Sequence, residues 1–365
     1  MNFDFSEEQK LLQQTARDYL AEHCPLDAAR AVLEGGGSHS ADLWKGVAEM
    51  GWLGAAVPES YGGAGFGRLE LSLIAMELGR ALAPIPFAPS VYLVTEALLE
   101  AGTDAQKERY LPRLASGELI GTFAWHEGVG RGSFGAQTTR FDGGTVTGTK
   151  LPVPDAGIAG LALTVVDVGG QAKLALVDLA SGARAEALET LDGSRPQARL
   201  VLDGARAELL GDDGRSAAFL EHLLDRAAVL LAFEQIGGAE RAFELTREFA
   251  LGRYAFGRPI ASFQALKHRM ADVYAAIQLA TSNAYYGAWA LSAGDPELAT
   301  AGCGARIGAS EAFDLAATEM IQIYGGVGFT WEYDCHLFYR RAKALSLAIG
   351  SPDEWSERLV ERLAA

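Results

Sequence analysis

The 365-residue sequence has few of the residues that mark disulfide-linked, metal-binding or nucleic-acid-binding proteins. Its three cysteines, Cys24, Cys303 and Cys335, are odd in number and scattered, which predicts reduced thiols rather than a disulfide framework. Its six histidines lie apart, without metal-ligand spacing, so we expect no metal site. The formal net charge of −16 argues against nucleic-acid binding, although a local basic cluster can still bind an anionic ligand.

Long hydrophobic runs and an export signal are lacking as well. No apolar run approaches the roughly 20 residues of a membrane span. The N-terminal MNFDFSEEQK has acidic residues where a signal peptide has basic ones, so we expect a cytoplasmic protein with no membrane association. Hydrophobic residues make up 49% of the chain, and its length suits two or three units of about 100–200 residues each.

The hydrophobic pattern divides the chain into three parts. Helical spacing dominates residues 6–118, where Ser6 and Gln9 have the spacing of a capping box. Residues 119–212 contain short apolar or alternating runs split by Gly, Asp and Pro, which indicates strands and turns. Long helical segments then return, with small residues along them as in a helix bundle. The order of helices, sheet and helices predicts an α+β fold, mostly α, in three compact parts.

The stretch GRGSFG at residues 130–135 matches the G-x-G-x-x-G pattern of dinucleotide-binding turns. Such a turn needs a helix after the glycines, because the helix N-terminus holds the pyrophosphate. The following AQTTRFDGGTVTGTK predicts strands and turns instead, so this interpretation is rejected. The loop alone leaves two alternatives open, which are an ordinary connection and a loop whose bare backbone approaches a flat ligand.

Four longer stretches carry a resemblance to a known family. They are GWLGAAVPESYGGAG (51–65), QKERYLPRLASGELIGTFA (106–124), RYAFGRPIASFQALKHRMADV (253–273) and QIYGGVGFTWEYDCHLFYRRAK (322–343). In this order and spacing they resemble the acyl-CoA dehydrogenase family over essentially the whole chain. The resemblance implies an N-terminal helical domain (1–118), a central β-barrel or β-sandwich domain (119–212) and a C-terminal four-helix bundle domain (213–365).

The resemblance also implies a cofactor and a reaction. Family members bind FAD, whose adenosine end reaches a neighbouring subunit of a dimer or tetramer. A carboxylate removes the α-proton of an acyl-CoA thioester while the flavin accepts the β-hydride. A positioned base is needed because the α-proton is only weakly acidic. Electron-transfer flavoprotein and oxygen both remain open as the final electron acceptor.

The adenosine side of the FAD site can be carried over residue by residue. The family motif Arg-x-x-Phe-Gly, which contacts the neighbour's FAD, corresponds to Arg253, Phe256 and Gly257 here. The downstream family glutamine corresponds to Gln264. The motif Gln-x-x-Gly-Gly-x-Gly corresponds to Gln322, Gly325, Gly326 and Gly328. An arginine can pair with pyrophosphate through two parallel hydrogen bonds, and glycines let the cofactor approach the backbone.

The flavin side departs from the family pattern. GRGSFG occupies the position of the flavin-contacting loop, where His126 replaces the family's threonine and Ser133 matches a serine only after a one-residue insertion. After GTK (148–150), Pro152 and Pro154 remove two N–H donors close to the expected flavin position. His126 either donates a hydrogen bond to the flavin or is a loop histidine with protein partners.

No catalytic base is identified. The position before Gly350 and Ser351 that holds the catalytic glutamate in many family members is Ile349, which cannot accept a proton. The alternative position on the first long C-terminal helix is Ala227. The nearest carboxylates are Asp225, which reaches the site only if the register shifts, and Glu234, which shares the face but lies two turns away. Both are expected to be charges on the helix surface, with the role of base as the alternative.

Three functional hypotheses follow. The first is an FAD-dependent acyl-CoA dehydrogenase with an atypical or missing base. The second is a non-catalytic partner subunit of a heteromeric acyl-CoA dehydrogenase, which contributes the adenosine side of a neighbour's FAD site. The third is a flavin-dependent oxidase or monooxygenase on the same scaffold. In addition, Gly237 and Gly238 within a helix predict a close approach of another backbone, with a neighbouring helix as the default.

Overall fold

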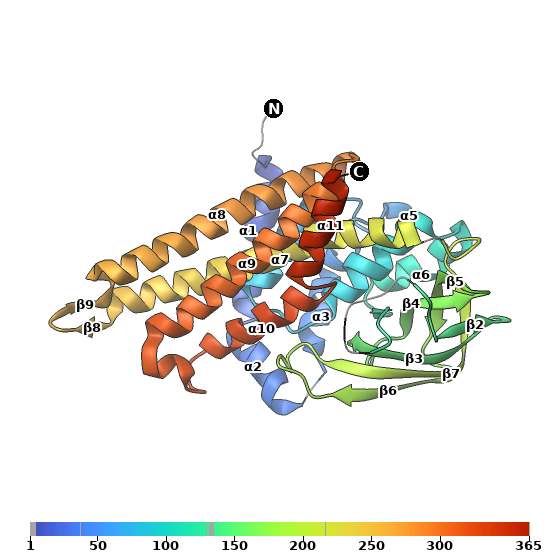
Figure 1. Cartoon of the computed structure of the whole chain (residues 1–365), viewed down its shortest axis with the longest axis horizontal. Helices are drawn as coiled ribbons and strands as arrows, with labels where there is room; N and C mark the ends of the chain where they lie inside the picture. Colours follow the sequence, from blue (N-terminus) through green and yellow to red (C-terminus); the bar gives the residue numbers. More distant parts are fainter. Residues whose placement is uncertain (1–4, 37, 129, 131–134, 216, 365) are drawn as a thin grey trace. The chain divides into compact units, whose positions relative to one another are not determined.

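The computed structural model describes residues 5–36, 38–128, 130, 135–215 and 217–364 (Figure 1). Backbone contacts divide the chain into two compact units. The first unit combines Met1–Arg30, Arg68–Ala83 and Ala228–Ala365, and the second combines Ala31–Gly67 and Pro84–Ala227. The predicted boundaries at 118/119 and 212/213 follow changes in secondary structure along the chain and stay a prediction. Within the described ranges, no helix is both long enough and apolar enough to cross a membrane.

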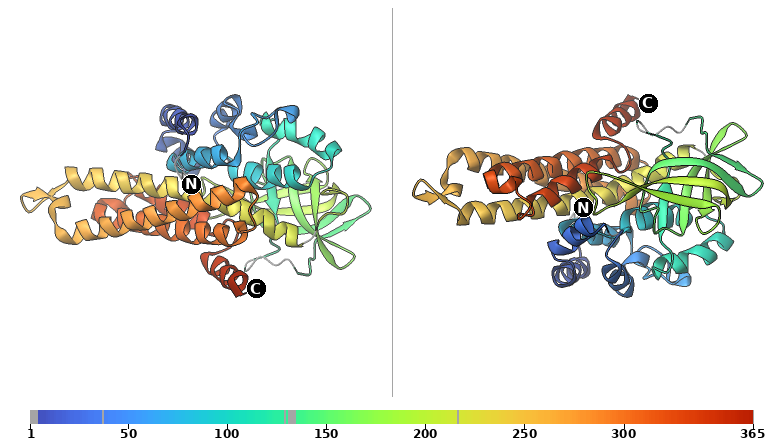
Figure 2. Two further views of the ribbon diagram at one scale, coloured as in Figure 1. Left: turned by 90° about the horizontal axis from the view of Figure 1, so that it is seen from above. Right: turned by 90° about the horizontal axis from the view of Figure 1, so that it is seen from below.

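The first unit is built of long helices (Figure 2). Its helices are α1 (Glu7–His23), α4 (Arg68–Arg80), the part of α7 (Ala217–Gly252) from residue 228, α8 (Gln264–Ala293), α9 (Leu298–Tyr324), α10 (Cys335–Leu347) and α11 (Pro352–Ala364). A hairpin of β8 (Tyr254–Ala255) and β9 (Arg258–Pro259), followed by the short helix η4 (Ile260–Ser262), joins α7 to α8. The short helix η5 (Gly325–Phe329) follows α9. The predicted capping box is confirmed: the Ser6 N–H donates to Gln9 Oε1, and the Gln9 N–H donates to Ser6 Oγ.

Glycines allow these helices to approach one another closely. A Cβ atom added to Gly237 on α7 would lie 1.8 Å from the carbonyl oxygen of Met76 on α4. A Cβ atom added to Gly238 would lie 2.5 Å from the ring of Phe313 on α9. Neither position has room for a side chain, so the predicted close approach to a neighbouring helix is confirmed.

The second unit combines helices with a sheet. Its helical segments are the later part of α2 (Leu26–Gly35), α3 (Ala41–Glu49), η1 (Trp52–Gly54), η2 (Glu59–Tyr61), the π-helix η3 (Ala88–Thr95), α5 (Glu96–Ala101), α6 (Asp104–Ala115) and the start of α7. The strands are β1 (Gly121–Ala124), β2 (Arg140–Asp142), β3 (Thr145–Pro154), β4 (Leu161–Val168), β5 (Gln171–Asp178), β6 (Ala183–Leu188) and β7 (Gln197–Leu209).

The sheet of the second unit closes on itself. Strand β4 pairs in parallel with β2, and the antiparallel pairs β2–β3, β3–β7, β7–β5 and β5–β4 complete the ring. Strands β1 and β6 extend it beside β4 and β7. Alternate residues, including Val146, Ala162, Val177 and Leu200, fill the interior. The predicted α+β class is therefore confirmed, and of the two expected forms of the β domain the structure has the barrel. GRGSFG is followed by strands β2 and β3 and not by the helix that a dinucleotide-binding turn requires, which agrees with the rejection of that interpretation.

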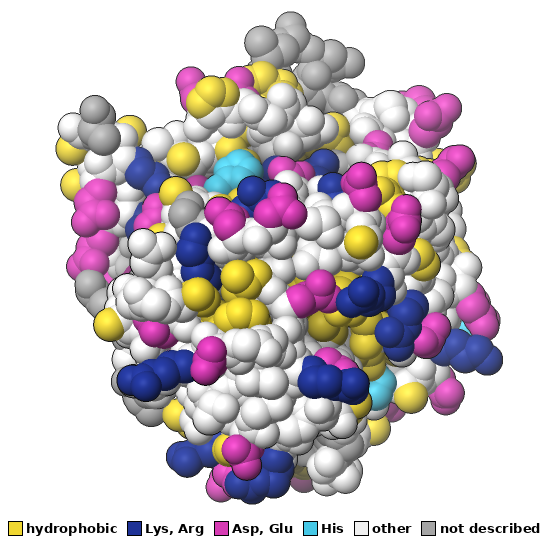
Figure 3. Space-filling view, turned by 90° about the vertical axis from the view of Figure 1, so that its right-hand side faces the viewer, with side chains coloured by type: hydrophobic (Ala, Val, Ile, Leu, Met, Phe, Trp, Pro, Cys, Tyr) yellow, Lys and Arg dark blue, Asp and Glu magenta, His cyan; other side chains and the backbone are white. Residues whose placement is uncertain are grey.

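Charges of both signs are mixed on the outside of the barrel. The face in Figure 3 carries interspersed basic and acidic side chains, with hydrophobic side chains in small groups. Exposed pairs such as Arg109 with Glu208 and Arg206 with Asp178 each place a guanidinium nitrogen 2.9 Å from a carboxylate oxygen. On this face the acidic side chains therefore do not form a single negatively charged patch.

Candidate functional site

The β8–β9 hairpin presents the Arg253 motif at the end of α7. The Arg253 N–H donates to the carbonyl of Phe249, and its own carbonyl accepts from the N–H of Ile260. Phe256 and Gly257 form the two-residue turn, with φ of 53° and 78°, the signs that a type I′ hairpin requires. Positive φ is unusual for phenylalanine, and such strained residues cluster at functional sites. The Phe256 side chain is also 95% exposed.

The charged group of this hairpin is available to a ligand. Arg253 is exposed, and in the described part of the chain its guanidinium has no hydrogen-bond or ion-pair partner. The guanidinium of Arg258 lies 4.2 Å from the ring centre of Phe263, which ties the hairpin to the start of α8. Gln264, the first residue of α8, is exposed. Arg253, Phe256 and Gln264 therefore lie within one short segment of the surface, and their cofactor role stays a prediction.

The second predicted motif lies where α9 ends, at the same end of the bundle as the hairpin (Figure 1). Gln322 is exposed in the last turn of α9, and the N–H of Gly325 donates back to its carbonyl. Gly325 has a φ of 65°, which favours glycine. Gly326 is exposed, and a Cβ added there would meet no atom within 4 Å. The backbone at Gly326 is therefore open to a ligand, as the glycine motif predicts.

The flavin-side residues lie in the second unit. His126 follows β1; its carbonyl accepts from the N–H of Leu151, and its ring packs edge-on against Trp125 with centroids 4.1 Å apart. His126 is thus half-buried and in contact with the protein, and its role toward the flavin stays a prediction. Ser133, predicted to bind the cofactor, lies outside the described residues.

A buried ammonium group connects Glu127 and Gln137, which lie before and after the predicted flavin-contacting loop. Lys150 on β3 is fully buried, and its Nζ lies 2.9 Å from Glu127 Oε1 and 2.8 Å from Gln137 Oε1. Glu127 also accepts from the backbone N–H groups of Thr138 and Thr139, each at 2.8 Å. Burial acts to raise the pKa of Glu127, but the hydrogen bonds from Lys150, Thr138 and Thr139 outweigh it and lower the pKa to about 2.

The prolines of β3 lie within the strand rather than after it. β3 continues through Pro152 and Pro154 and pairs with β7 on either side of a register shift between Lys150 and Val153. Such an irregularity accommodates a residue that has no N–H to donate. The two expected losses of an N–H donor therefore fall at a bulge and at the strand end.

The position expected for the C-terminal base is apolar and rigidly held. Ile349 is 1% exposed, and its carbonyl accepts from Trp355 Nε1 at 3.2 Å. Ser351 and Glu354 form a capping box at the start of α11. Hydrogen bonds with α11 therefore hold this segment in place, but the side chain at position 349 cannot accept a proton.

The expectation that Asp225 and Glu234 lie on the helix surface is wrong. Both are buried, with 3% and 2% exposure, as are Ala227 and Ala228 beside them. The reason is that α7 is covered on all sides along its middle, so its polar residues do not define a solvent face.

Glu234 has an electrostatic neighbour on α9. Arg306 is fully buried; its guanidinium donates to Gln235 Oε1 on α7 and to the carbonyl of Leu345 on α10. Burial lowers the pKa of Arg306, and the negative charge of Glu234 opposes this. Glu234 is thus coupled to a structural cation. The neighbouring Arg306 does not favour a role for Glu234 as the catalytic base.

Sequence reasoning missed Lys150 and Arg306 as buried cations. Lys150 shares the inward face of β3 with Val146, which is four residues earlier, so the period of two along the strand could have indicated its burial. In α9, Arg306 lies between Cys303, Ala305 and Ala309, all of them buried, in a segment that carries no other charge until Glu311. A single arginine in such an apolar stretch is expected to be buried and to have hydrogen-bond partners.

The comparisons with known proteins agree with these elements. Residues 6–118 match the model for the N-terminal domain of acyl-CoA dehydrogenases, and residues 215–363 match the model for the C-terminal domain. Acyl-CoA dehydrogenase IpdE2 of Mycobacterium tuberculosis is 34% identical over 97% of this chain and 96% of its own length. The chain belongs to the acyl-CoA dehydrogenase family. As a member of this family, the chain is an oxidoreductase of the flavoenzyme type.

Two solved structures are similar over nearly the whole chain. A variant of the Tcur3481-Tcur3483 steroid ACAD is 30% identical, with a TM-score of 0.89 and coverage of 98% of both chains. The ChsE4-ChsE5 complex from Mycobacterium tuberculosis is 28% identical, with a TM-score of 0.91, covering 100% of this chain and 99% of that one. In both cases the described protein combines two differently named components.

Proposed function

We propose that this chain takes part in the FAD-dependent α,β-dehydrogenation of an acyl-CoA thioester as one subunit of a hetero-oligomer. In this assembly it lends Arg253 and the Gly325–Gly326 backbone to the adenosine side of a neighbour's FAD, and a partner subunit supplies the base. The observation that carries the proposal is the buried, apolar Ile349 at the family's base position.

The residues at and near the alternative base position also support a role in which a partner subunit supplies the base. Ala227 is fully buried and cannot accept a proton, and Glu234 lies in the field of the buried Arg306. A general base must reach its proton within hydrogen-bonding distance. The carboxylate of Glu234 lies close enough to Arg306 to act on its charge, so it is part of a buried structural cluster.

The adenosine half of FAD fits the residues that are present. An exposed guanidinium without a protein partner can bind a pyrophosphate through paired hydrogen bonds, and the open backbone at Gly326 can approach a flat ring. The exposed Phe256 offers an aromatic face at the same hairpin. When bound, the flavin supplies the two-electron chemistry, while the protein supplies binding and orientation.

The relatives favour a two-component assembly and a bulky substrate. The names of the Tcur3481-Tcur3483 protein and of the ChsE4-ChsE5 complex each join two components, and the first is described as a steroid enzyme. We extend both features to this chain, so that the partner is a second acyl-CoA dehydrogenase homologue and the acyl group is a steroid-derived or similarly bulky CoA thioester.

The test is the visible absorption spectrum of the purified chain, which gives the amount of flavin per subunit with and without added FAD. It is repeated after co-expression with a second acyl-CoA dehydrogenase homologue that has a glutamate at the base position. We expect little flavin with the chain alone, and in the complex we expect flavin that bleaches with an acyl-CoA. Replacing the partner's glutamate by glutamine should abolish the bleaching while leaving the flavin bound.

A different result would identify one of the other hypotheses. Stoichiometric flavin that bleaches with an acyl-CoA in the chain alone would establish an autonomous dehydrogenase. Asp225→Asn and Glu234→Gln would then be the first variants to examine for loss of the base. Steady hydrogen peroxide formation in air, without any need for electron-transfer flavoprotein, would instead indicate an oxidase.

A further inference from the structure

The segment 330–336, here called the strap, comprises the connection between η5 and α10 in the first unit and the first two residues of α10. It is fastened by one residue from a distant part of the sequence, Arg30 on α2. Arg30 Nη1 donates to the carbonyl of Trp331 at 2.6 Å, and Nη2 donates to Asp334 Oδ1 at 2.7 Å. Nη1 also lies 3.4 Å from Nε2 of His336. One guanidinium therefore contacts the beginning, the middle and the end of the strap.

The strap in turn packs against the glycine turn. The ring of Tyr333 meets that of Tyr324 edge-on, with centroids 5.8 Å apart, and Tyr324 directly precedes Gly325. Tyr324 also stacks on Phe249 in the last turns of α7, with centroids 3.9 Å apart and ring planes 11° apart. Contacts therefore run from Arg30 through the strap to the end of α9.

We propose that Arg30 is a positioning residue for the turn Gly325–Phe329, and that it holds this turn in the arrangement that receives the adenosine of a neighbour's FAD. The inference rests on the proposed function for the identity of the ligand. The ordering of the turn by Arg30 follows from the contacts of this chain alone.

The turn Gly325–Phe329 needs support from outside because its own packing is uneven. Gly326 has no atom within 4 Å of an added Cβ, so little packing fixes the backbone there. Glycine also gives a chain much freedom, which has to be removed for precise binding. The turn packs against α9 at Gly328, where an added Cβ would lie 2.6 Å from the carbonyl oxygen of Ile321. After Phe329 the chain continues directly into the strap, which Arg30 contacts.

The planar guanidinium suits this task better than an ammonium group. Arg30 directs two nitrogens to two acceptors that lie three residues apart in the strap, and its side chain is only 17% exposed. A lysine carries its donors on a single nitrogen and cannot reproduce this fork. Arg30→Lys should therefore preserve the charge but retain only part of the function.

The first experiment is hydrogen exchange of the full-length chain, read by mass spectrometry. In Arg30→Gln we expect exchange in peptides covering 322–336 to be faster by about tenfold or more, because hydrogen bonds to charged groups add to local stability. Arg30→Lys should give an intermediate increase. Peptides from the middle of α8 and α9 should be unchanged.

Arg17→Gln is the matched control. Arg17 also lies in the first unit and binds a single carboxylate, that of Glu77, through Nε at 2.9 Å and Nη2 at 2.8 Å. Its replacement should speed up exchange in α1 and α4 and leave 322–336 unaffected. Unchanged exchange of 322–336 in Arg30→Gln would overturn the proposal, as would an equal increase in the control variant.

The second experiment compares FAD with FMN, which lacks the adenosine. In the assembled protein, Arg30→Gln should weaken FAD binding several-fold and leave FMN binding unchanged. An equal loss for both would mean that Arg30 supports the structure in general, and the positioning role would be rejected. If the wild-type assembly binds FAD no better than FMN, the proposed adenosine site itself fails, whatever the exchange result.

Discussion

Lys150 and Glu127 form an ion pair that is buried on the lysine side, with Nζ 2.9 Å from Oε1 and no exposed surface on the lysine side chain. The same ammonium donates to Gln137, and the same carboxylate accepts from Thr138 and Thr139. The pair therefore joins the two ends of the loop 128–136 to strand β3. The resemblance predicts that flavin contacts lie in this loop, so the ion pair holds the ends of a predicted cofactor-binding segment.

Glu127→Gln should destabilise the protein because it leaves a buried ammonium group without its counter-charge. Breaking a buried pair costs about 3–5 kcal/mol, and we expect the free energy of unfolding to fall by about 3 kcal/mol, since the glutamine still offers a carbonyl. Urea unfolding at pH 7 measures the change. Glu7→Gln, which breaks the exposed pair with Lys10, is the control and should alter stability by less than about 1 kcal/mol.

The acid dependence of stability provides a second measure of the same pair. The folded pKa of Glu127 is lowered to about 2, below its ordinary value of 4.5, so its contribution is present above pH 4.5 and is lost as the pH falls towards 2. In Glu127→Gln this part of the acid dependence should vanish. If wild type and variant lose stability in parallel between pH 4.5 and 2, the pair does not contribute as described.

Arg306 and Glu234 provide a prediction about structure and catalysis together. Arg306→Met should destabilise the protein by about 3–5 kcal/mol, because it removes the donors to Gln235 and Leu345 and leaves the charge of Glu234 buried. A double-mutant cycle with Glu234→Gln should give a coupling energy above about 0.5 kcal/mol. Glu234→Gln alone should leave the flavin-bleaching rate of the assembled enzyme within about tenfold of wild type. A loss of a hundredfold or more would identify Glu234 as the base and contradict the proposed function.

Much of the fold was predictable because local signals and tertiary structure agree. The helix capped by Ser6 and Gln9, the strands after residue 119 and the close approach at Gly237 all depend on spacing within a short stretch. The closure of the barrel was not decided by such signals. It depends on the pairing of β4 with both β2 and β5, and sequence patterns alone do not distinguish a barrel from a sandwich.

The sequence motifs indicated candidate residues for the site but not the contacts that hold them in place. The motifs singled out Arg253 and Gln322, whose cofactor roles stay predictions, but they did not predict the hairpin that carries Phe256 and Gly257. The contact between Arg30 and the strap joins residues about 300 positions apart, and no local pattern predicts it. The burial of Asp225 and Glu234 was mistaken for exposure because a helix surrounded on all sides loses its amphipathic period.

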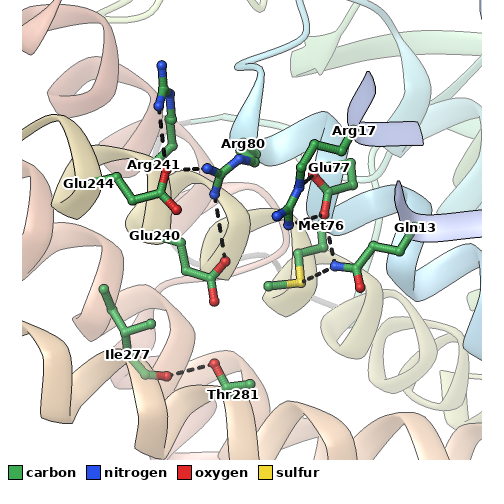
Figure 4. A network of polar contacts seen from close by, with 10 residues as sticks. All are labelled: Gln13, Arg17, Met76, Glu77, Arg80, Glu240, Arg241, Glu244, Ile277 and Thr281. Atoms are coloured by element: carbon green, nitrogen blue, oxygen red, sulfur yellow. Dashed lines mark hydrogen bonds and ion pairs between the residues drawn. The ribbon is translucent and has the colours of Figure 1, made fainter. Parts of the chain in front are cut away.

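Glu240 on α7 is predicted to destabilise the protein at neutral and alkaline pH. It lies in the cluster of Figure 4, where Glu240 Oε2 is 3.9 Å from Arg80 Nη1, too far for a hydrogen bond. Burial raises the pKa of Glu240 to about 7; the positive charges of Arg80 and Arg17 oppose this, and the negative charges of Glu77 and Glu244 add to it.

The sign of the pH dependence follows from this pKa. Between about pH 4.5 and 7 the folded state binds more protons at Glu240 than the unfolded state does, so this residue makes stability decrease as the pH rises. Glu240→Gln should remove this decrease and raise the free energy of unfolding at pH 8 by about 1–3 kcal/mol, the equivalent of one to two pKa units. Thermal or urea unfolding at pH 5 and pH 8 measures it, with Glu248→Gln on the exposed side of α7 as control. An equal loss of stability at both pH values would show that the ion pair with Arg80 outweighs the burial of the charge.

His336 should make the strap sensitive to acid. Its ring stacks on Trp331 with centroids 4.3 Å apart and ring planes 12° apart, and its Nε2 lies 3.4 Å from Arg30 Nη1. Burial lowers the pKa of His336, as do the positive charges of Arg30 and Arg340, while a hydrogen bond with the Trp331 backbone and the charge of Asp334 oppose this. The neutral imidazole can accept a hydrogen bond from Arg30, whereas the protonated ring presents a donor to a donor.

The contribution of His336 is therefore present above its ordinary pKa of about 6.5 and is lost as the pH falls below that value. We expect the fluorescence of Trp331, taken as the difference between wild type and Trp331→Phe, to change with a midpoint below about pH 6.5. Exchange of peptides covering 330–336 should accelerate over the same range. Both changes should be absent in His336→Gln, which keeps a polar side chain but cannot be protonated. A pH response that persists in this variant would assign the transition to another group. A response centred above pH 6.5 would contradict the lowered pKa of His336, because it would mean that burial and the two arginines do not disfavour the charged imidazole.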